Sequence, residues 1–177
     1  MPDAPLVAAP SMLILPHVVA ALGAFTLGVV ALRARPGSRT HRRAGTGYVA
    51  GWVVLALMGA LMGHRHANVS PFEVLNALGA TAVALGYLPV LVPAARRRMA
   101  GADGRGWLRW HLRFMVGSMP FLVVAGLNQT LPAVGVPYST SLLTATTALS
   151  VVVTHWVAHT LLLRHHLIPA GARRVAV

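Results

Sequence analysis

Five stretches of the sequence, each close to twenty residues or longer, are almost free of charged side chains. A helix needs about twenty apolar residues to cross the hydrocarbon core of a membrane. Lone strands cannot cross, because lipid offers no partner for their backbone groups, and closed barrels require an alternating pattern that these stretches lack. We therefore predict a single all-α transmembrane domain over residues 1–177, a bundle of five helices at about 12–33, 44–64, 72–95, 107–131 and 139–164.

The low charge of the chain supports this interpretation. Charged residues make up 10% of the sequence and apolar residues 56%, whereas soluble domains carry about 25% charged residues. A chain of 177 residues leaves most of its residues near a surface. That surface must therefore be apolar, which predicts contact with the lipid bilayer. The sequence has no cysteine, which excludes disulfides, thiolate metal sites and a cysteine nucleophile.

The basic residues are distributed unevenly along this predicted topology. All 15 are arginine, and 14 of them lie between the first two helices, around the start of the fourth, or at the end of the fifth; the exception is Arg65. Basic loops remain in the cytoplasm. We therefore expect a multi-pass protein of the inner (plasma) membrane, with its N-terminus outside and its C-terminus in the cytoplasm. The net charge of +12 then reflects topology, and nucleic acid is not an expected partner.

Glycines spaced by four residues mark expected helix contacts. Gly47 and Gly51 form one such pair on the second helix, and Gly59 and Gly63 form another. Small residues let helix backbones approach closely in lipid, where apolar burial gives little drive for association. The same spacing also arises by chance in helices rich in glycine and alanine.

Four histidines are expected in the cytoplasmic half of the bundle. His41 comes just before the second helix, His111 lies at the start of the fourth, and His155 and His159 share one face of the fifth. Neutral imidazole ligates haem iron, and arginine grips carboxylates such as haem propionates. The candidate cofactor-binding residues are His41, His111, His155, His159, Arg42, Arg109 and Arg113. The expected axial pair is His111 with His155 or His159, and the alternative is that these rings only pack against backbone carbonyls.

A second group of ionisable residues is expected on the outer side. It comprises His17, His64, His66 and Glu73. Imidazole and carboxylate groups are metal ligands, so this group is a candidate metal site. The alternative is that His64 and His66 are ordinary loop residues and that His17 belongs to a buried network.

The sequence leaves the enzymatic role open. It contains no nucleophile elbow, phosphate-binding loop or zinc-protease motif, and the residues from His155 to His159 lack the glutamate of a zinc protease. Glu73 is the one acid near a predicted helix. Ion-coupled carriers commonly place a carboxylate within the membrane, so the sequence argues against that class.

Three segments resemble a known family. They are the first helix with His17 and Gly23, Thr40 to Tyr48 (THRRAGTGY), and Trp110 to Ser118 (WHLRFMVGS). These segments are similar to the DUF2306 family of predicted bacterial membrane proteins, and the resemblance covers about Pro16 to Leu131. Phe114 and Gly117 depart from the family pattern, which usually has tryptophan and often a second arginine there. The resemblance implies a multi-helix membrane protein, with a looser likeness in fold to cytochrome b561-type bundles.

The sequence therefore predicts one function and leaves two alternatives. The leading hypothesis is a b-type haem or quinone-linked redox protein with a redox partner or quinone in the membrane. One alternative is a non-enzymatic small carrier or structural membrane subunit. The other is a metal-binding membrane protein that uses the outer group. The sequence does not indicate an oligomeric state.

Overall fold

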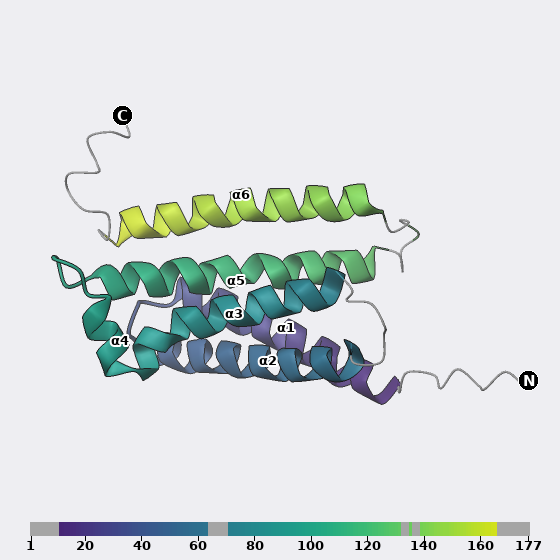
Figure 1. Cartoon of the computed structure of the whole chain (residues 1–177), viewed down its shortest axis with the longest axis horizontal. Helices are drawn as coiled ribbons and strands as arrows, with labels where there is room; N and C mark the ends of the chain where they lie inside the picture. The colour runs from purple at the N-terminus through teal and green to yellow at the C-terminus, as the bar shows by residue number, and fades with distance from the viewer. Residues whose placement is uncertain (1–10, 64–70, 132–134, 136–138, 166–177) are drawn as a thin grey trace, which may run out of the picture. The chain divides into compact units, whose positions relative to one another are not determined.

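The computed structural model describes residues 11–63, 71–131, 135 and 139–165. These residues form six α-helices, and none of them lies in a β-strand (Figure 1). Five helices are long and one is short: α1 (Ser11–Arg33), α2 (Arg39–Gly63), α3 (Pro71–Leu91), α4 (Pro93–Arg98), α5 (Gly106–Thr130) and α6 (Thr140–Arg164).

Each of the five long helices is long and apolar enough to cross a membrane, which confirms the predicted number of spans. Large apolar side chains are exposed along them, including Leu15 and Leu22 on α1 and Val152 and Trp156 on α6. Exposed apolar side chains on this scale are unfavourable in water and suit a lipid environment. The chain is therefore a multi-pass membrane protein.

Two compact units divide the chain, Met1–Ala77 and Leu78–Val177. In the first unit, α1 packs against α2. A Cβ atom added to Gly47 would lie 2.8 Å from Cδ1 of Leu27, and one added to Gly51 would lie 2.8 Å from Cβ of Ala24. Both contacts are tighter than real Cβ contacts allow. The predicted close approach at this glycine pair is therefore present, and its partner is α1.

The helix α2 begins at Arg39, five residues before the predicted start at 44. Ser38 explains the difference, because its Oγ accepts a hydrogen bond from the backbone N–H of His41 at 3.1 Å. A serine that satisfies one of the free N–H groups of the first turn stabilises a helix start. We had expected His41 and Arg42 to precede the helix. They instead lie in its first turn.

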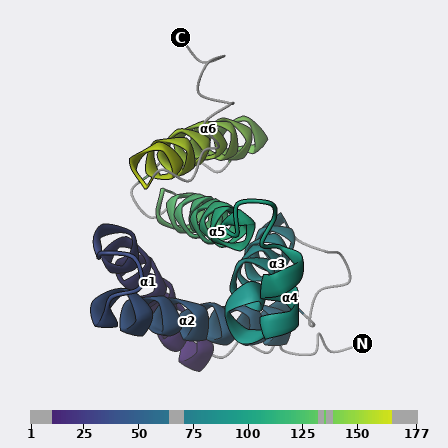
Figure 2. The same ribbon diagram turned by 90° about the vertical axis from the view of Figure 1, so that its left-hand side faces the viewer.

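In the second unit, α5 packs along α6 (Figure 2). Ala158 and Leu162 are buried and lie four residues apart, on one face of α6. The other side of this helix is largely exposed, and α6 is the least buried of the five spans.

The helix α3 ends at Leu91, whereas the predicted helix ran to 95. Val92 is extended, with φ −111° and ψ 102°, and Pro93 opens the separate helix α4. A proline disfavours the helical conformation for the residue before it, and it fits well at the first position of a new helix. The chain turns here, so α4 takes a different direction from α3 (Figure 1).

Candidate functional site

His111 joins α5 to α3 through its side chain. The half-buried ring places Nδ1 2.8 Å from the carbonyl oxygen of Gly86. A carbonyl oxygen can only accept a hydrogen bond, so Nδ1 carries the proton and, in the neutral ring, Nε2 keeps its lone pair. The neighbouring Trp110 donates from Nε1 to the carbonyl oxygen of Leu85 at 2.9 Å. The two bonds fix the start of α5 against the last turns of α3.

Gly86 makes this approach feasible. A Cβ atom at this position would lie 3.0 Å from Cβ of Phe114 and 3.1 Å from Cγ of Met115. Both neighbours lie on α5, in the turn that follows His111. The absence of a side chain at Gly86 therefore lets α5 come close enough for the ring of His111 to reach the α3 backbone.

His41 has the same arrangement at the start of α2. Its half-buried ring places Nδ1 3.0 Å from the carbonyl oxygen of Ala31, near the end of α1. The same reasoning assigns the proton to Nδ1 and the lone pair to Nε2. The alternative that these histidines only pack predicts bonds of this kind to backbone carbonyls. In both rings the bond is made by Nδ1.

A repeated pattern underlies the two arrangements, and the sequence reasoning missed it. Histidine, arginine and glycine occur at identical spacing in the two helices: His41, Arg43 and Gly47 on α2, and His111, Arg113 and Gly117 on α5. The next residue is buried in both helices, Tyr48 in one and Ser118 in the other. The spacing His-x-Arg-x-x-x-Gly is the sequence signal that could have revealed this repeat.

A second repeat lies in the partner helices. The sequence Ala-Leu-Gly-Ala occurs at 21–24 in α1 and again at 77–80 in α3. Each of these helices also supplies the carbonyl that binds a histidine, Ala31 in one and Gly86 in the other. In both cases a histidine near the start of one span therefore bonds to a backbone carbonyl of the preceding span.

His155 and His159 are brought together on α6. Their ring centroids are 6.5 Å apart, and their planes differ by 11°. Both side chains are exposed, beside the buried face that carries Ala158. The structure therefore pairs these two histidines with each other, whereas His111 is directed toward α3.

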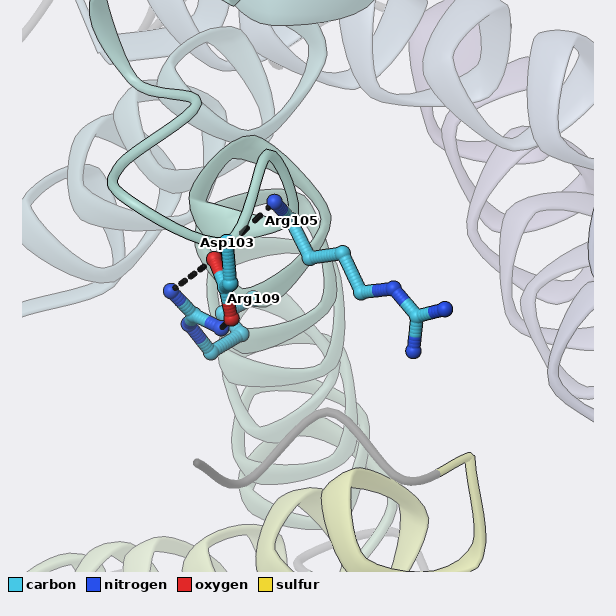
Figure 3. A network of polar contacts seen from close by, with 3 residues as sticks. All are labelled: Asp103, Arg105 and Arg109. Carbon is cyan, nitrogen blue, oxygen red and sulfur yellow. Dashed lines mark hydrogen bonds and ion pairs between the residues drawn. The ribbon is translucent and has the colours of Figure 1, made fainter. Parts of the chain in front are cut away.

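The arginines predicted to accompany the histidines have different roles. Arg42 and Arg113 are exposed. Arg109 is already engaged, because both of its terminal nitrogens donate to the carboxylate of Asp103 (Figure 3). Glu73 was predicted to be the one acid near a helix, so no role was predicted for Asp103. The carboxylate is exposed, but it holds Arg109.

This ion pair also orders the loop before α5. The backbone N–H of Arg105 donates to Oδ1 of Asp103 at 3.1 Å. The side-chain bonds from Arg109, followed by this backbone bond, lower the pKa of Asp103 to about 2. Asp103 is thus a fixed negative charge at neutral pH, and it compensates the charge of Arg109.

Only two of the four residues predicted for the outer metal site, His17 and Glu73, lie within the described part of the chain. His64 and His66 lie outside the described residues. His17 is half-buried on α1, and its Nδ1 is buried without a hydrogen-bond partner among the described residues. Glu73 lies in the first turn of α3. Within the described part of the chain, no three histidine, aspartate or glutamate side chains lie close enough to hold a metal ion.

Comparison with known proteins gives no assignment, since no family model, no curated protein and no solved structure matches the chain. The resemblance to DUF2306 therefore stays a prediction that rests on the short motifs quoted above.

Proposed function

We propose that the protein is a redox protein of the bacterial inner membrane that binds a b-type haem through His111. A membrane quinone or a redox protein would be its electron partner. When bound, the haem supplies one-electron chemistry at its iron. The chain supplies the imidazole ligands, their orientation and an apolar surrounding.

The bond from His111 to Gly86 carries this proposal. A histidine that binds a metal commonly donates its other ring N–H to a backbone carbonyl or a carboxylate, which fixes the ring and its tautomer. The Nδ1–H of His111 donates in this way at 2.8 Å. Its Nε2 is therefore the atom suited to ligate iron. His41 is built in the same way, with Ala31 as its acceptor.

The second axial ligand would come from α6. His155 and His159 are exposed and nearly parallel, so both are accessible to a flat macrocycle. Two histidines four residues apart lie on the same side of their helix and cannot ligate opposite faces of one haem. We therefore assign one of them as the partner of His111. Arg42 and Arg113 remain candidates for binding propionates, and Arg109 is the weaker candidate because Asp103 occupies it.

The test separates iron ligation from helix packing. The detergent-purified protein, expressed with haem supply, is examined by absorption spectroscopy before and after reduction with dithionite. We expect reduced-state α and Soret bands at near-stoichiometric haem. His111→Asn keeps a side-chain N–H near the position of Nδ1 but has no atom equivalent to Nε2. This variant should fold normally and lose the haem bands.

Two further variants complete the test. Either His155→Ala or His159→Ala should alter the bands, and the one that does so identifies the second ligand. His165→Ala, at the C-terminal cap of α6, is the matched control and should leave the spectrum unchanged. A featureless spectrum under good haem supply would remove the proposal. Metal analysis of the purified protein would then decide between a metal-binding protein and a carrier or structural subunit.

The orientation is a separate part of the proposal, and the arginine distribution supports it. The chain lacks cysteine, so single-cysteine variants can be labelled without background. We expect a membrane-impermeant maleimide to label Thr130→Cys in intact cells and Ala102→Cys only after permeabilisation. The reverse pattern would place the N-terminus in the cytoplasm.

A further inference from the structure

The segment that carries α4 lies at a membrane surface. The span of α3 ends at Leu91 and that of α5 begins at Gly106. The intervening chain, residues 92–105, therefore emerges from the membrane and returns to it. None of the residues of α4 is buried. This segment lies at the depth of lipid headgroups, where phosphate groups are nearby.

Positive charge dominates this segment. Arg96, Arg97, Arg98 and Arg105 are all exposed. Asp103 is the single acid in the sequence after Glu73, and Arg109 already binds it. Within the second unit no other carboxylate side chain exists, so Arg97, Arg98 and Arg105 have no acidic side chain to pair with there.

The structure holds these charges in a fixed frame. The guanidinium of Arg96 lies 4.2 Å from the ring centroid of Trp107, which attaches α4 to α5. Gly101 and Gly104 adopt φ angles of 70° and 69°, a conformation that side chains disfavour. The backbone N–H of Gly106 donates to Ala100 at 2.6 Å and closes the loop. Figure 3 shows the side chain of Arg105 extending away from Asp103.

We propose that α4 and the loop after it, residues 93–105, form a binding site for the phosphate of an anionic phospholipid. Arg97, Arg98 and Arg105 supply the positive charge, since guanidinium binds phosphate through paired N–H donors. Trp107 places an amphipathic ring at the same level, as is common at membrane interfaces. A phospholipid without a compensating cationic headgroup is favoured, because the site holds no free acid to bind that cation. This inference rests on the membrane location and not on the proposed haem.

The experiment measures lipid binding to the full chain in detergent. Native mass spectrometry gives the affinity for phosphatidylglycerol, with phosphatidylcholine as the reference lipid. The variant Arg97→Gln/Arg98→Gln/Arg105→Gln should bind phosphatidylglycerol about tenfold more weakly, since basic residues at a membrane surface each contribute to anionic lipid binding. The matched control, Arg33→Gln/Arg35→Gln/Arg39→Gln, removes three exposed arginines from the end of α1, the connection that follows and the start of α2. It should change the affinity less than twofold.

Three results would overturn the proposal. Equal losses in the two triple variants would show that lipid responds to total charge and not to this site. Equal affinity of the wild-type protein for the two lipids would show that the protein does not select an anionic phospholipid. Displacement of the lipid by inorganic phosphate, at an ionic strength matched with chloride, would identify a site for a soluble anion. Replacement of the same three arginines by lysine retains the charge but removes the paired N–H donors, so its affinity should lie between those of the wild type and the glutamine variant.

Discussion

The side-chain amide of Asn76, on α3, donates a hydrogen bond to the main-chain carbonyl oxygen of Leu55, on α2, at an N···O distance of 3.3 Å. Gly59 makes room for this amide, because a Cβ atom at that position would overlap Nδ2 of Asn76. A polar side chain within a span is thus held by a backbone acceptor on the neighbouring helix. The glycine one turn further along is what allows it.

This relationship predicts that Gly59→Ala acts through Asn76. The alanine should force the amide to rotate and break its bond, at a cost of about 1 kcal/mol in the free energy of unfolding. Asn76→Ala should cost a similar amount, and adding Gly59→Ala to it should cost almost nothing more. Unfolding of the four proteins in detergent gives this double-mutant cycle. Additive losses would mean that Gly59 has another role.

Gly51 and Gly45 should respond differently to the same substitution. A Cβ atom at Gly51 would meet Ala24 at 2.8 Å and the α1 backbone at 3.3 Å, whereas Gly45 has no neighbouring atom within 4 Å. Gly51→Ala should therefore push α1 and α2 apart and destabilise the protein by about 1–3 kcal/mol. Gly45→Ala should be neutral or slightly stabilising, since alanine favours helix. Thermal unfolding of both variants measures the difference.

His41 should contribute to the α1–α2 pair through its bond to Ala31. His41→Leu removes the donor and leaves the carbonyl of Ala31 without its side-chain partner, so we expect a loss of about 1 kcal/mol in the free energy of unfolding. His41→Asn offers an N–H near the position of Nδ1 and should retain most of the stability. Equal losses in the two variants would show that ring packing, and not the hydrogen bond, carries the contribution.

The loop before α5 should depend on pH through Asp103. Its pKa is about 2 in the folded protein against an ordinary value of 3.8. The unfolded chain therefore binds more protons between these values, and the stabilising contribution is complete above pH of about 4 and lost as the pH falls toward 2. Carboxyl NMR of labelled Asp103 measures the titration, and Arg109→Gln should return the pKa toward 3.8. A midpoint near the ordinary value in the wild type would contradict the geometry.

Apolar length and charge were enough to predict the number of spans, because both depend on the membrane and not on details of packing. The ends of α2 and α3 were predicted less well. The start of α2 depends on the cap provided by Ser38, and the end of α3 depends on Pro93. Ser38 lies in a basic segment outside the predicted helices, whereas Pro93 lies inside an apolar stretch, where length and charge alone do not indicate a helix end.

The candidate site was predicted only as a set of residues. Helical spacing placed His155 and His159 side by side, as the structure confirms. The acceptors of His41 and His111 lie on other helices, so their identity depends on which helices pack together. That choice is made by small residues such as Gly86 and is not visible in the spacing of the histidines. The pairing of Asp103 with Arg109 depends on the loop between them, in which Gly104 adopts a positive φ angle.

The bond between His41 and Ala31 connects residues only ten positions apart along the chain. Its two partners become available almost together during synthesis, as soon as α1 and the first turn of α2 have left the ribosome. The first helical pair can therefore close before any later span has been made. The bond from His111 to Gly86 joins α5 to α3, and only the short segment that carries α4 separates these two spans. Each histidine bond therefore joins two consecutive spans, so neither bond depends on a span that is made later.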